Sequence, residues 1–347
     1  MVSGNLKVAF ALAERFKQNC FSECDMKRLS AFAAVRDKTV PELDAMQMRE
    51  LFCGAEAVVT SWGTPAVTTE LLREAKYLRL ICHCAGSVKG MIDGRVWADI
   101  RRRNILISTT STALGIGVAE FTLGMIIAGL KKTFFMRDEI RKGQWRELQG
   151  RWFDQPENAL VPAEPYDITI GVIGAGCCGS HLIKLLRNFE VKILVYDPYK
   201  TAEDCCGIGA EKSELERLVE SSDVITVHAP NIPKTKGLIS RELLRKVKNG
   251  ALFINTAPGI EIDEEALIEE LKTGRFYACL DQTIVQPAPH NHPLRNMKNV
   301  MLTPHIAGHV SNGFKRQGKC VVDELERFAR GEKLKYILNL ERLSIIE

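Results

Sequence analysis

The sequence predicts an α/β protein of two domains, the larger of which is built on a doubly wound parallel sheet. The 347 residues exceed one ordinary domain and are enough for two hydrophobic cores. Apolar runs of strand length alternate with helical patterns along most of the chain, as parallel βαβ units require. A glycine-rich segment, residues 171–179, lies between a strand-like run and a helix-like run. These three observations together predict the fold class.

The first hundred residues alternate as a small parallel α/β unit should. Strands are expected at Lys7–Ala11, Ala57–Ser61, Leu78–Cys82 and Ile105–Ser108, and helices at Glu42–Phe52 and Thr69–Ala75. A long apolar helix at Ala113–Lys132 then leads to a polar, proline-containing stretch, Gly143–Pro165, which is predicted to be an extended connection.

The alternation repeats from Ile168 onward, as in a doubly wound sheet. Strands are expected at Ile168–Ile173, Val191–Tyr196, Val224–His228, Ala251–Asn255, Tyr277–Leu280 and Val300–Leu302, and helices at His181–Phe189, Lys212–Val219, Arg241–Val247 and Glu264–Lys272. A last helix, Gly313–Arg330, is expected to pack back on the smaller domain. The predicted domains are therefore residues 1–110 with 306–347, and residues 111–305.

The glycine-rich segment has the pattern of a dinucleotide-binding turn. Gly174 permits the tight strand-to-helix turn, Gly176 allows the backbone to approach a pyrophosphate, and Gly179 allows the helix to pack close to the sheet. Asp197 ends the next strand at about the expected spacing, roughly 20 residues, for the carboxylate that binds ribose hydroxyls. A carboxylate at this position repels the 2′-phosphate of NADP, so NAD is favoured over NADP. Lys200 is the only nearby cation that could weaken this preference. A glycine turn without a ligand is the alternative.

Composition excludes several functional classes. The 47 Lys and Arg residues against 43 Asp and Glu give a net charge of +4, and no basic run stands out, so nucleic acid is a poor partner candidate. Eleven cysteines, adjacent pairs among them, and an N-terminus without a basic-then-apolar signal segment predict a reduced, cytoplasmic protein.

Two features raise alternatives that the pattern does not favour. Cys82 and Cys84, with His83 between them, could suggest a metal, but alternation along a strand places both thiols on one face and no second ligand pair has zinc spacing, so buried thiols are expected and no metal. The apolar stretch Ala113–Leu130 contains Glu120 and four glycines and is predicted not to span a membrane.

Three later segments give a family resemblance. They are Ile-Asn-Thr-Ala-Pro-Gly at 254–259, Leu-Asp through Gln-Pro to Pro-Leu at 280–294, and Leu-Thr-Pro-His-Ile-Ala-Gly at 302–308. With the glycine turn and Tyr196-Asp197-Pro198-Tyr199, the chain resembles the D-isomer-specific 2-hydroxyacid dehydrogenase family over nearly its whole length.

The resemblance implies a Rossmann cofactor domain that binds NAD, a smaller flavodoxin-like substrate domain, a small-molecule substrate and a homodimer joined through the cofactor domain. His305 matches the family's histidine, which exchanges a proton with the substrate oxygen while the nicotinamide exchanges hydride. The cofactor-binding residues implied are Gly174, Gly176, Cys177, Cys178, Asp197, His228, Ala229, Pro230, Thr235, Thr256, Ala257, Asp281, His305 and Gly308. The substrate-binding residues implied are Trp62, Gly63, Gly86, Ser87 and Lys89.

The chain departs from the family pattern at two catalytic positions. Pro258 stands where the family has the arginine that holds the substrate carboxylate, and Gln286 stands where it has the glutamate that pairs with the histidine. Proline has neither a cation nor an N–H, so the bidentate hold is absent. Gln286 can still hydrogen-bond to His305, but it has no charge with which to raise an imidazole pKa. Lys89 is the candidate for the missing cation, with an exposed or helix-capping lysine as the alternative.

Two functions remain open from the sequence. The first is an NAD-dependent oxidoreductase with His305 as acid/base, assisted by Gln286 and Lys89, acting on a small hydroxy, keto or sugar acid. The second is an NAD(H)-binding pseudoenzyme that acts as a sensor or scaffold, which would account for both substitutions.

Overall fold

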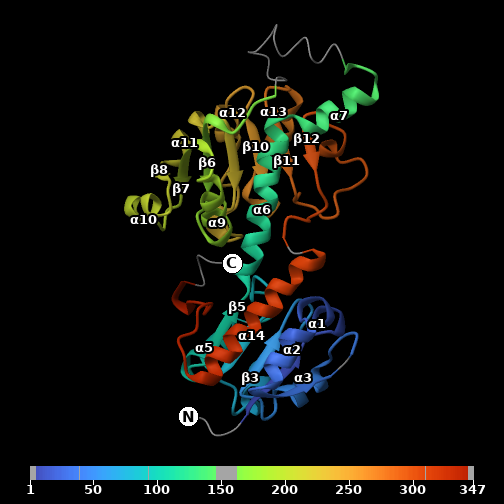
Figure 1. Ribbon diagram of the computed structural model, residues 1–347, viewed down its shortest axis with the longest axis vertical. Helices are drawn as coiled ribbons and strands as arrows, with labels where there is room; N and C mark the ends of the chain where they lie inside the picture. The colour runs from blue at the N-terminus through green and yellow to red at the C-terminus, as the bar shows by residue number, and fades with distance from the viewer. Residues whose placement is uncertain (1–4, 39, 93, 146–161, 309, 343–347) are drawn as a thin grey trace. The chain divides into compact units, whose positions relative to one another are not determined.

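The chain divides into two compact α/β units. Unit 1 holds residues 1–114 and 309–347, and unit 2 holds residues 115–308. The computed structural model describes residues 5–38, 40–92, 94–145, 162–308 and 310–342. Every strand pair in both sheets is parallel, which confirms the predicted fold class (Figure 1).

Unit 1 is built on a five-stranded sheet in the order β2-β1-β3-β4-β5. This is the flavodoxin-like order expected of the smaller domain. Its elements are β1 (Leu6–Ala11), α1 (Glu14–Cys20), α2 (Glu23–Ser30), β2 (Ala33–Asp37), α3 (Ala45–Phe52), β3 (Ala57–Thr60), α4 (Thr69–Glu74), β4 (Leu80–His83), α5 (Val96–Arg102), β5 (Leu106–Thr109) and α14 (Phe314–Arg330), with short 3-10 turns at Ser311–Gly313 and Leu340–Arg342.

Successive residues of the unit 1 strands point to opposite faces, and each face is buried under a different set of helices. Ala9 and Ile81 lie in a core with helices α3, α4 and α5. Phe10 and Leu80 lie in a second core with α1, α2 and α14. Both faces of the sheet are therefore covered, which explains the nearly continuous apolar runs in its central strands.

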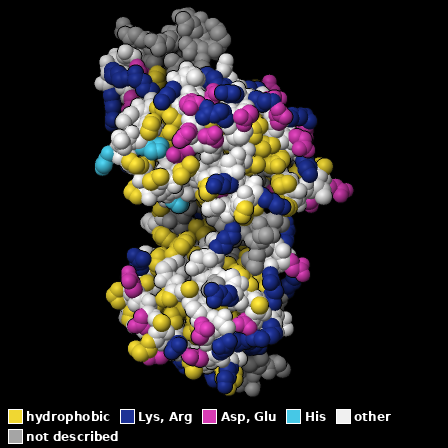
Figure 2. All heavy atoms as spheres, turned by 180° about the vertical axis from the view of Figure 1, so that it is seen from behind, with side chains coloured by type: hydrophobic (Ala, Val, Ile, Leu, Met, Phe, Trp, Pro, Cys, Tyr) yellow, Lys and Arg dark blue, Asp and Glu magenta, His cyan; other side chains and the backbone are white. Residues whose placement is uncertain are grey.

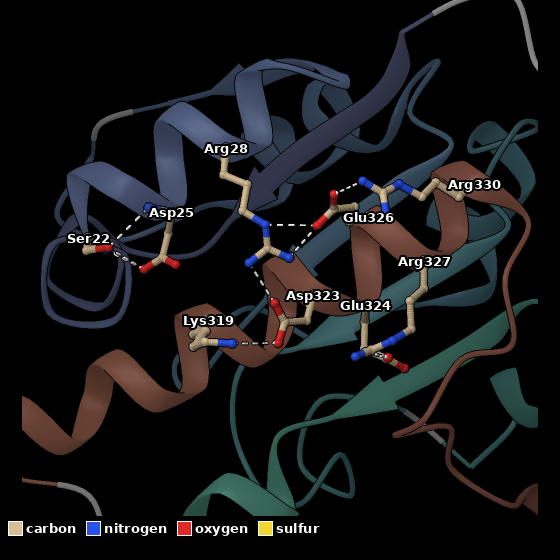
Figure 3. A network of polar contacts seen from close by, with 9 residues as sticks. All are labelled: Ser22, Asp25, Arg28, Lys319, Asp323, Glu324, Glu326, Arg327 and Arg330. Atoms are coloured by element: carbon tan, nitrogen blue, oxygen red, sulfur yellow. Dashed lines mark hydrogen bonds and ion pairs between the residues drawn. The ribbon is translucent and has the colours of Figure 1, made fainter.

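Helix α14 returns the chain to unit 1, as the sequence predicts. Figure 3 shows the charged contacts that accompany this packing: Arg28 of α2 lies between Asp323, at 2.6 Å, and Glu326 of α14. Such partly exposed pairs contribute about 0–1 kcal/mol each. The buried Val321 and Leu325 contribute more, about 1.5–3 kcal/mol each. Apolar burial thus accounts for most of the attachment.

Unit 2 is built on a seven-stranded sheet in the order β12-β11-β10-β9-β6-β7-β8. Its elements are the greater part of α6 (Ser111–Leu130), then α7 (Thr133–Arg141), β6 (Tyr166–Ile173), α9 (Cys177–Leu186), β7 (Glu190–Tyr196), α10 (Ala202–Gly207), β8 (Glu211–Lys212), α11 (Leu215–Ser221), β9 (Val224–Val227), α12 (Arg241–Lys246), β10 (Leu252–Asn255), α13 (Glu264–Lys272), β11 (Tyr277–Leu280) and β12 (Val300–Leu302), with 3-10 turns at Pro233–Thr235, Gly259–Glu261 and Pro293–Arg295. The order reverses between β6 and β9, as in the Rossmann arrangement.

Helix α6 belongs to the core of unit 2 over part of its surface. Ala119, Ile126 and Leu130 are buried with residues of α9 and the sheet. By length and composition the helix could also cross a membrane, a test that core helices pass as well, and 39% of its most apolar window is buried. Gly129 permits close packing here, because a Cβ atom on it would lie 2.6 Å from a methyl of Leu252.

Several predicted boundaries change in the structure. The helix expected from His181 already begins at Cys177, and the helix expected at Lys212–Val219 is wrong at its start, because Lys212 belongs to β8 and α11 begins at Leu215. The sequence patterns missed β2, a short edge strand that ends in Arg36 and Asp37 and so lacks a continuous apolar run. The elements α1, α2, α5, α7, α10 and β8 were also not expected. The predicted connection Gly143–Pro165 lies mostly outside the described residues.

Acidic and basic side chains are interspersed on the face of the molecule in Figure 2. Ion pairs on the surface, such as Lys246 with Glu220 at 2.9 Å and Lys131 with Glu164 at 2.7 Å, fit this distribution. It agrees with the small net charge and adds no support for a nucleic-acid partner.

Candidate functional site

The predicted cofactor residues of unit 2 meet at one edge of its sheet. Strands β6, β7, β9, β10, β11 and β12 are parallel, so their carboxyl ends share that edge. The segments that follow these strands hold Gly174–Cys178, Asp197, His228–Pro230, Thr256–Ala257, Asp281 and His305–Gly308, in that order. The switch point between β6 and β9 lies among them, where α/β sheets of this kind bind ligands.

Two glycines shape the turn between β6 and α9. Gly174 has a positive φ of 91°, and a Cβ atom there would lie 2.7 Å from the carbonyl oxygen of His228. A Cβ atom on Gly179 would lie 2.0 Å from the carbonyl oxygen of Gly174. Since no side chain fits at either place, the turn requires glycine for its own shape, and the predicted roles of both residues in the turn agree with the structure.

Gly176 differs from these two glycines, because a Cβ atom on it would meet nothing within 4 Å. It precedes α9, whose first residues are Cys177 and Cys178. The first N–H groups of a helix have no partner within the helix, and its dipole favours an anion. An open position at the N-terminus of a ten-residue helix therefore fits a pyrophosphate.

Asp197 is held in a fixed orientation at the end of β7. Its Oδ2 accepts a hydrogen bond from the N–H of Ala175 at 2.9 Å, and its Oδ1 accepts one from the N–H of Tyr199 at 2.9 Å. The carboxylate is thereby tied to the glycine turn itself. This is the position from which an acidic side chain receives ribose hydroxyls.

The segment after β9 forms a neutral wall beside the turn. His228 makes hydrogen bonds to the hydroxyls of Thr226 (3.0 Å) and Thr256 (3.4 Å), and burial lowers its pKa to about 4. Ala229 is buried and Pro230 is half-buried. Thr235 donates to the carbonyl oxygen of Pro230 at 2.5 Å, which fixes the end of the segment. A neutral imidazole with two hydroxyl partners is suited to packing beside the turn rather than to acid/base catalysis at neutral pH.

The segment after β10 is a closed turn before Pro258. The side chain of buried Asn255 both accepts from the N–H of Ala257 and donates to its carbonyl oxygen, each at 3.1 Å. Pro258 then precedes Gly259, where a Cβ atom would lie 2.7 Å from the backbone nitrogen of Ile284. Position 258 therefore lies next to the segment that leads to Gln286. The clamp by Asn255 was not predicted.

His305 lies against Gln286, as the sequence predicts. The Nδ1 of His305 is 2.9 Å from the Oε1 of Gln286. The Nε2 of Gln286 donates to the Oε1 of Gln282 (3.0 Å) and to the carbonyl oxygen of Thr283 (3.3 Å). Because both donor bonds of the amide nitrogen fix its orientation, Oε1 faces the imidazole, and Nδ1 must be the protonated nitrogen. The Nε2 of a neutral His305 is then free to accept a proton.

Asp281 holds the His305 segment in place. Its Oδ1 accepts from the hydroxyl of Thr303 (2.6 Å) and the N–H of Ile306 (2.9 Å), and its Oδ2 accepts from the N–H of Ala307 (2.8 Å). The N–H of His305 donates to the Asp281 carbonyl oxygen at 3.0 Å. His305 has a positive φ of 55°, which costs energy for a residue other than glycine and is enforced by these bonds. All three hydrogen bonds to the Asp281 carboxylate are thus structural, a role that the sequence did not indicate.

The predicted substrate residues all follow strands of unit 1 at the carboxyl edge of its sheet. Trp62 and Gly63 follow β3, and Gly86, Ser87 and Lys89 follow β4. The backbone N–H groups of residues 86–88 donate to no acceptor among the residues that the structure describes. Such a run of N–H groups can bind an anion.

His83 contacts both that loop and the neighbouring strand β3. It is buried, it makes a hydrogen bond to the hydroxyl of Thr60 at 2.9 Å, and it bonds to the backbone of Ser87. Burial lowers its pKa to about 4, so the imidazole is neutral at physiological pH.

The cysteines offer no metal site in the described part of the chain. Cys82 and Cys84 are both buried, as expected of thiols on one face of a strand. Among the described residues no group of three or more His, Cys, Asp or Glu side chains could hold a metal ion.

Comparisons with known proteins agree with the site geometry. Residues 123–307 match the family described as D-isomer specific 2-hydroxyacid dehydrogenase, NAD binding domain. The chain is 36% identical over 249 residues to glyoxylate reductase of Thermofilum pendens, which covers 71% of this chain and 72% of that relative. It is 28% identical to D-3-phosphoglycerate dehydrogenase of Methanocaldococcus jannaschii over 86% of this chain but only 54% of that protein, so it spans about half the length of this relative.

A solved structure shows the same fold over both units. A phosphoglycerate oxidoreductase from Rhizobium etli superposes with a TM-score of 0.80 over 96% of this chain and 98% of the other, at 23% identity. The glycine turn, the fixed Asp197 and the open helix N-terminus fit NAD, the cofactor of the matched domain. The chain belongs to the D-isomer-specific 2-hydroxyacid dehydrogenase family.

Proposed function

We propose that the protein is an NAD-dependent oxidoreductase that interconverts a small 2-hydroxy acid and its 2-keto acid, or a related sugar acid, with His305 as the acid/base. The observation on which this proposal rests is the pairing of His305 with Gln286 at the edge that holds the dinucleotide turn. The relatives named glyoxylate reductase and D-3-phosphoglycerate dehydrogenase support the same class of substrate.

In this proposal the residues of unit 2 hold the dinucleotide at three places. The open turn at Gly176 and the first N–H groups of α9 bind the pyrophosphate, and Asp197 binds the ribose. Thr256, Ala257, Asp281 and Gly308 border the nicotinamide, with the neutral wall at His228–Pro230 and Thr235. When bound, the reduced cofactor supplies the hydride that reduces the carbonyl carbon.

His305 supplies the proton for the same step. Protonated His305 donates the proton on Nε2 to the substrate oxygen as the carbonyl becomes a hydroxyl, and in the oxidation direction the neutral Nε2 accepts it back. Gln286 keeps Nδ1 protonated and therefore keeps Nε2 as the reacting nitrogen. A neutral amide does not stabilise the imidazolium as a carboxylate would, so this proton exchange is weaker than in family members with glutamate.

Unit 1 is proposed as the substrate domain. Its N–H groups at residues 86–88 would bind an acid group of the substrate, with Trp62 and Gly63 beside them and Lys89 as a cation nearby. Since the chain spans about half of its longer relatives, the whole protein's activity and partners are part of the proposal.

A second candidate function is an NAD(H)-binding protein without hydride transfer. Pro258 and Gln286 favour it, because both replace charged groups of the family's reaction. A panel of glyoxylate, hydroxypyruvate, 3-phosphohydroxypyruvate and sugar acids, followed by nicotinamide absorbance, separates the two. Turnover that His305→Ala abolishes supports the oxidoreductase. NADH binding without any turnover supports the second function.

We also propose a homodimer joined through unit 2 and a reducing, cytoplasmic location. Helix α7 has no buried residue, and Ile127 of α6 and Ile140 of α7 are 39% and 38% exposed, so this surface can pair with a second copy. All eleven cysteines are free, as in a reducing compartment. Light scattering that gives the mass of one chain would contradict the dimer.

A further inference from the structure

At the carboxyl edge of the unit 1 sheet, hydrogen bonds connect the ends of three adjacent strands. The hydroxyl of Thr64 donates to the carbonyl oxygen of Ala11, the last residue of β1, at 2.8 Å. It also accepts from the N–H of Ser61, after β3, at 2.9 Å. The hydroxyl of Ser61 in turn donates to the carbonyl oxygen of Cys84, after β4, at 3.1 Å. Two side chains on the loop after β3 therefore tie this loop to the end of β1 and to the loop after β4.

Arg15, at the start of α1, lies beside these connected strand ends. Its guanidinium lies 4.8 Å from the centre of the Phe16 ring, and its Nη2 is 4.0 Å from the place where a Cβ atom on Gly63 would lie. The absence of a side chain at position 63 leaves the guanidinium this room. Arg15 thus lies directly beside the predicted substrate residues Trp62 and Gly63.

Arg15 differs from the other cations near it in having no acceptor. Lys17 forms an ion pair with Asp37, and Lys315 donates to the carbonyl oxygens of Gln18 (2.7 Å) and Phe21 (3.2 Å). Arg15 is exposed and makes no hydrogen bond or ion pair with any residue that the structure describes. A guanidinium fork that is stacked on a ring but has no acceptor is suited to receive a carboxylate.

The surroundings strengthen such an interaction. The Trp62 ring packs against Phe16, with 6.0 Å between ring centroids, and against Phe314 at 6.4 Å. The contact with the Phe16 ring limits the conformations of the exposed arginine, so less side-chain entropy is lost when it binds a carboxylate. The N–H groups of residues 86–88 lie two strands away on the same edge, since β3 separates β1 from β4.

We propose that Arg15 binds the acid group of the substrate, together with the N–H groups of residues 86–88, and so supplies a positive charge for that group from unit 1. This inference rests on the proposed function for its choice of ligand, a small carboxylate. It assigns the role of the missing cation to Arg15 rather than to Lys89.

The test measures carboxylate binding separately from turnover. Oxamate, an unreactive analogue of a 2-keto acid, is titrated by calorimetry into full-length protein saturated with NADH. Removing one charge-assisted contact typically weakens binding roughly tenfold to a hundredfold, so Arg15→Gln is expected to weaken oxamate by that factor. Arg15→Lys, which keeps the charge and loses the fork, is expected to lie between Arg15→Gln and the wild type. NADH affinity and the melting temperature should stay at the wild-type values in both variants.

Arg73→Gln is the matched control. Arg73 is exposed in the last turn of α4 and precedes β4, so it lies at the opposite edge of the same sheet. It is expected to leave oxamate binding unchanged. Wild-type protein that does not bind oxamate, an Arg15→Gln variant that binds it normally, or a larger loss in Lys89→Gln than in Arg15→Gln would each overturn the proposal.

The same variants distinguish this inference from the proposed function. If oxamate binding depends on Arg15 while no acid in the panel is turned over, the inference stands and the oxidoreductase proposal fails. If keto acids are reduced by wild type and Arg15→Gln with equal KM, the oxidoreductase proposal stands and the inference fails.

Discussion

The Nδ1 of His305 lies 2.9 Å from the Oε1 of Gln286, so a neutral amide holds the imidazole. An amide oxygen fixes the tautomer of a histidine as well as a carboxylate does, because either accepts the proton on Nδ1. It differs in charge, since only a carboxylate stabilises the imidazolium. If His305 is the acid/base that we propose, Gln286 orients its imidazole without adding a negative charge beside it.

Substitution of Gln286 separates these two contributions. Gln286→Leu removes the acceptor, and the loss of orientation is expected to lower kcat on the order of a hundredfold. Gln286→Glu keeps an acceptor and adds charge, so the acid limb of the pH–rate profile is expected to move to higher pH. Steady-state kinetics across pH measures both, with NADH affinity as the control. A Gln286→Leu variant with wild-type kcat would exclude this role.

Substitutions of Gly179 and Gly176 are expected to affect different quantities: the first lowers stability and the second weakens NADH binding. Gly179→Ala would place a Cβ atom 2.0 Å from the Gly174 carbonyl oxygen, so we expect a loss of several kcal/mol in unfolding free energy, on the order of 3 or more. Gly176→Ala meets nothing within 4 Å, so stability is retained while NADH binding weakens as the methyl enters the pyrophosphate position. Urea unfolding and NADH fluorescence measure the two quantities. Normal NADH affinity in Gly176→Ala would place the pyrophosphate elsewhere.

Asp197 is expected to set the preference for NAD over NADP. Asp197→Asn keeps an acceptor oxygen for only one of the two N–H groups, of Ala175 and Tyr199, that hold the carboxylate, and it removes the charge that repels a 2′-phosphate. The ratio of NADPH to NADH affinity should rise about tenfold or more, since removing one close like charge is worth about 1.4 kcal/mol or more. Glu203→Gln, an exposed charge change on α10, is the control. An unchanged ratio would mean that Asp197 does not face the ribose.

Much of the site could be predicted because its chemistry depends on backbone shape. The glycine turn, Asp197 and the His305–Gln286 pair are local patterns at strand ends, and parallel strands bring all strand ends to one edge. What could not be predicted depends on contacts between distant segments. The clamp of the His305 segment by Asp281 and the position of Arg15 beside Gly63 arise from tertiary packing, which leaves no periodic signal in the sequence. Edge strand β2 was missed for a related reason, because a strand with one neighbour can have polar residues.

Lys132 is expected to destabilise unit 2 at neutral pH. Only 5% of the residue is exposed, and burial lowers its pKa from 10.5 to about 8, while its Nζ lies 3.9 Å from the centre of the Tyr277 ring. Because the unfolded chain binds the proton more tightly, stability rises as the pH rises from about 8 to 10.5, and the full cost is present below 8. The cation–π contact offsets part of this cost.

Lys132→Met should therefore raise the unfolding free energy at pH 7 by about 1–3 kcal/mol, and the gain should shrink toward pH 10.5. Urea unfolding at a series of pH values measures the difference. Lys131→Met, at the exposed neighbouring lysine paired with Glu164, is the control and should show no such pH dependence. A gain that stays constant with pH would mean that the charge on Lys132 is not responsible.

Position 258 offers a further test of the proposed substrate cation. Pro258 has φ near −52°, a conformation that arginine adopts without strain, and Gly259 brings position 258 next to the Thr283–Ile284 backbone that leads to Gln286. Pro258→Arg with Gln286→Glu would introduce the two charged groups that the family resemblance predicts at these positions. If Arg15 already binds the substrate acid group, a second guanidinium adds little affinity, and the double variant should raise kcat more than it lowers KM on small 2-keto acids. If the site has no working cation, KM should fall by roughly tenfold or more as well, because a bidentate carboxylate contact is gained. Steady-state kinetics of the double variant, with and without Arg15→Gln, distinguishes these two cases. If Arg15 binds the substrate, the arginine introduced at position 258 should lower KM strongly only when Arg15 has been replaced by glutamine.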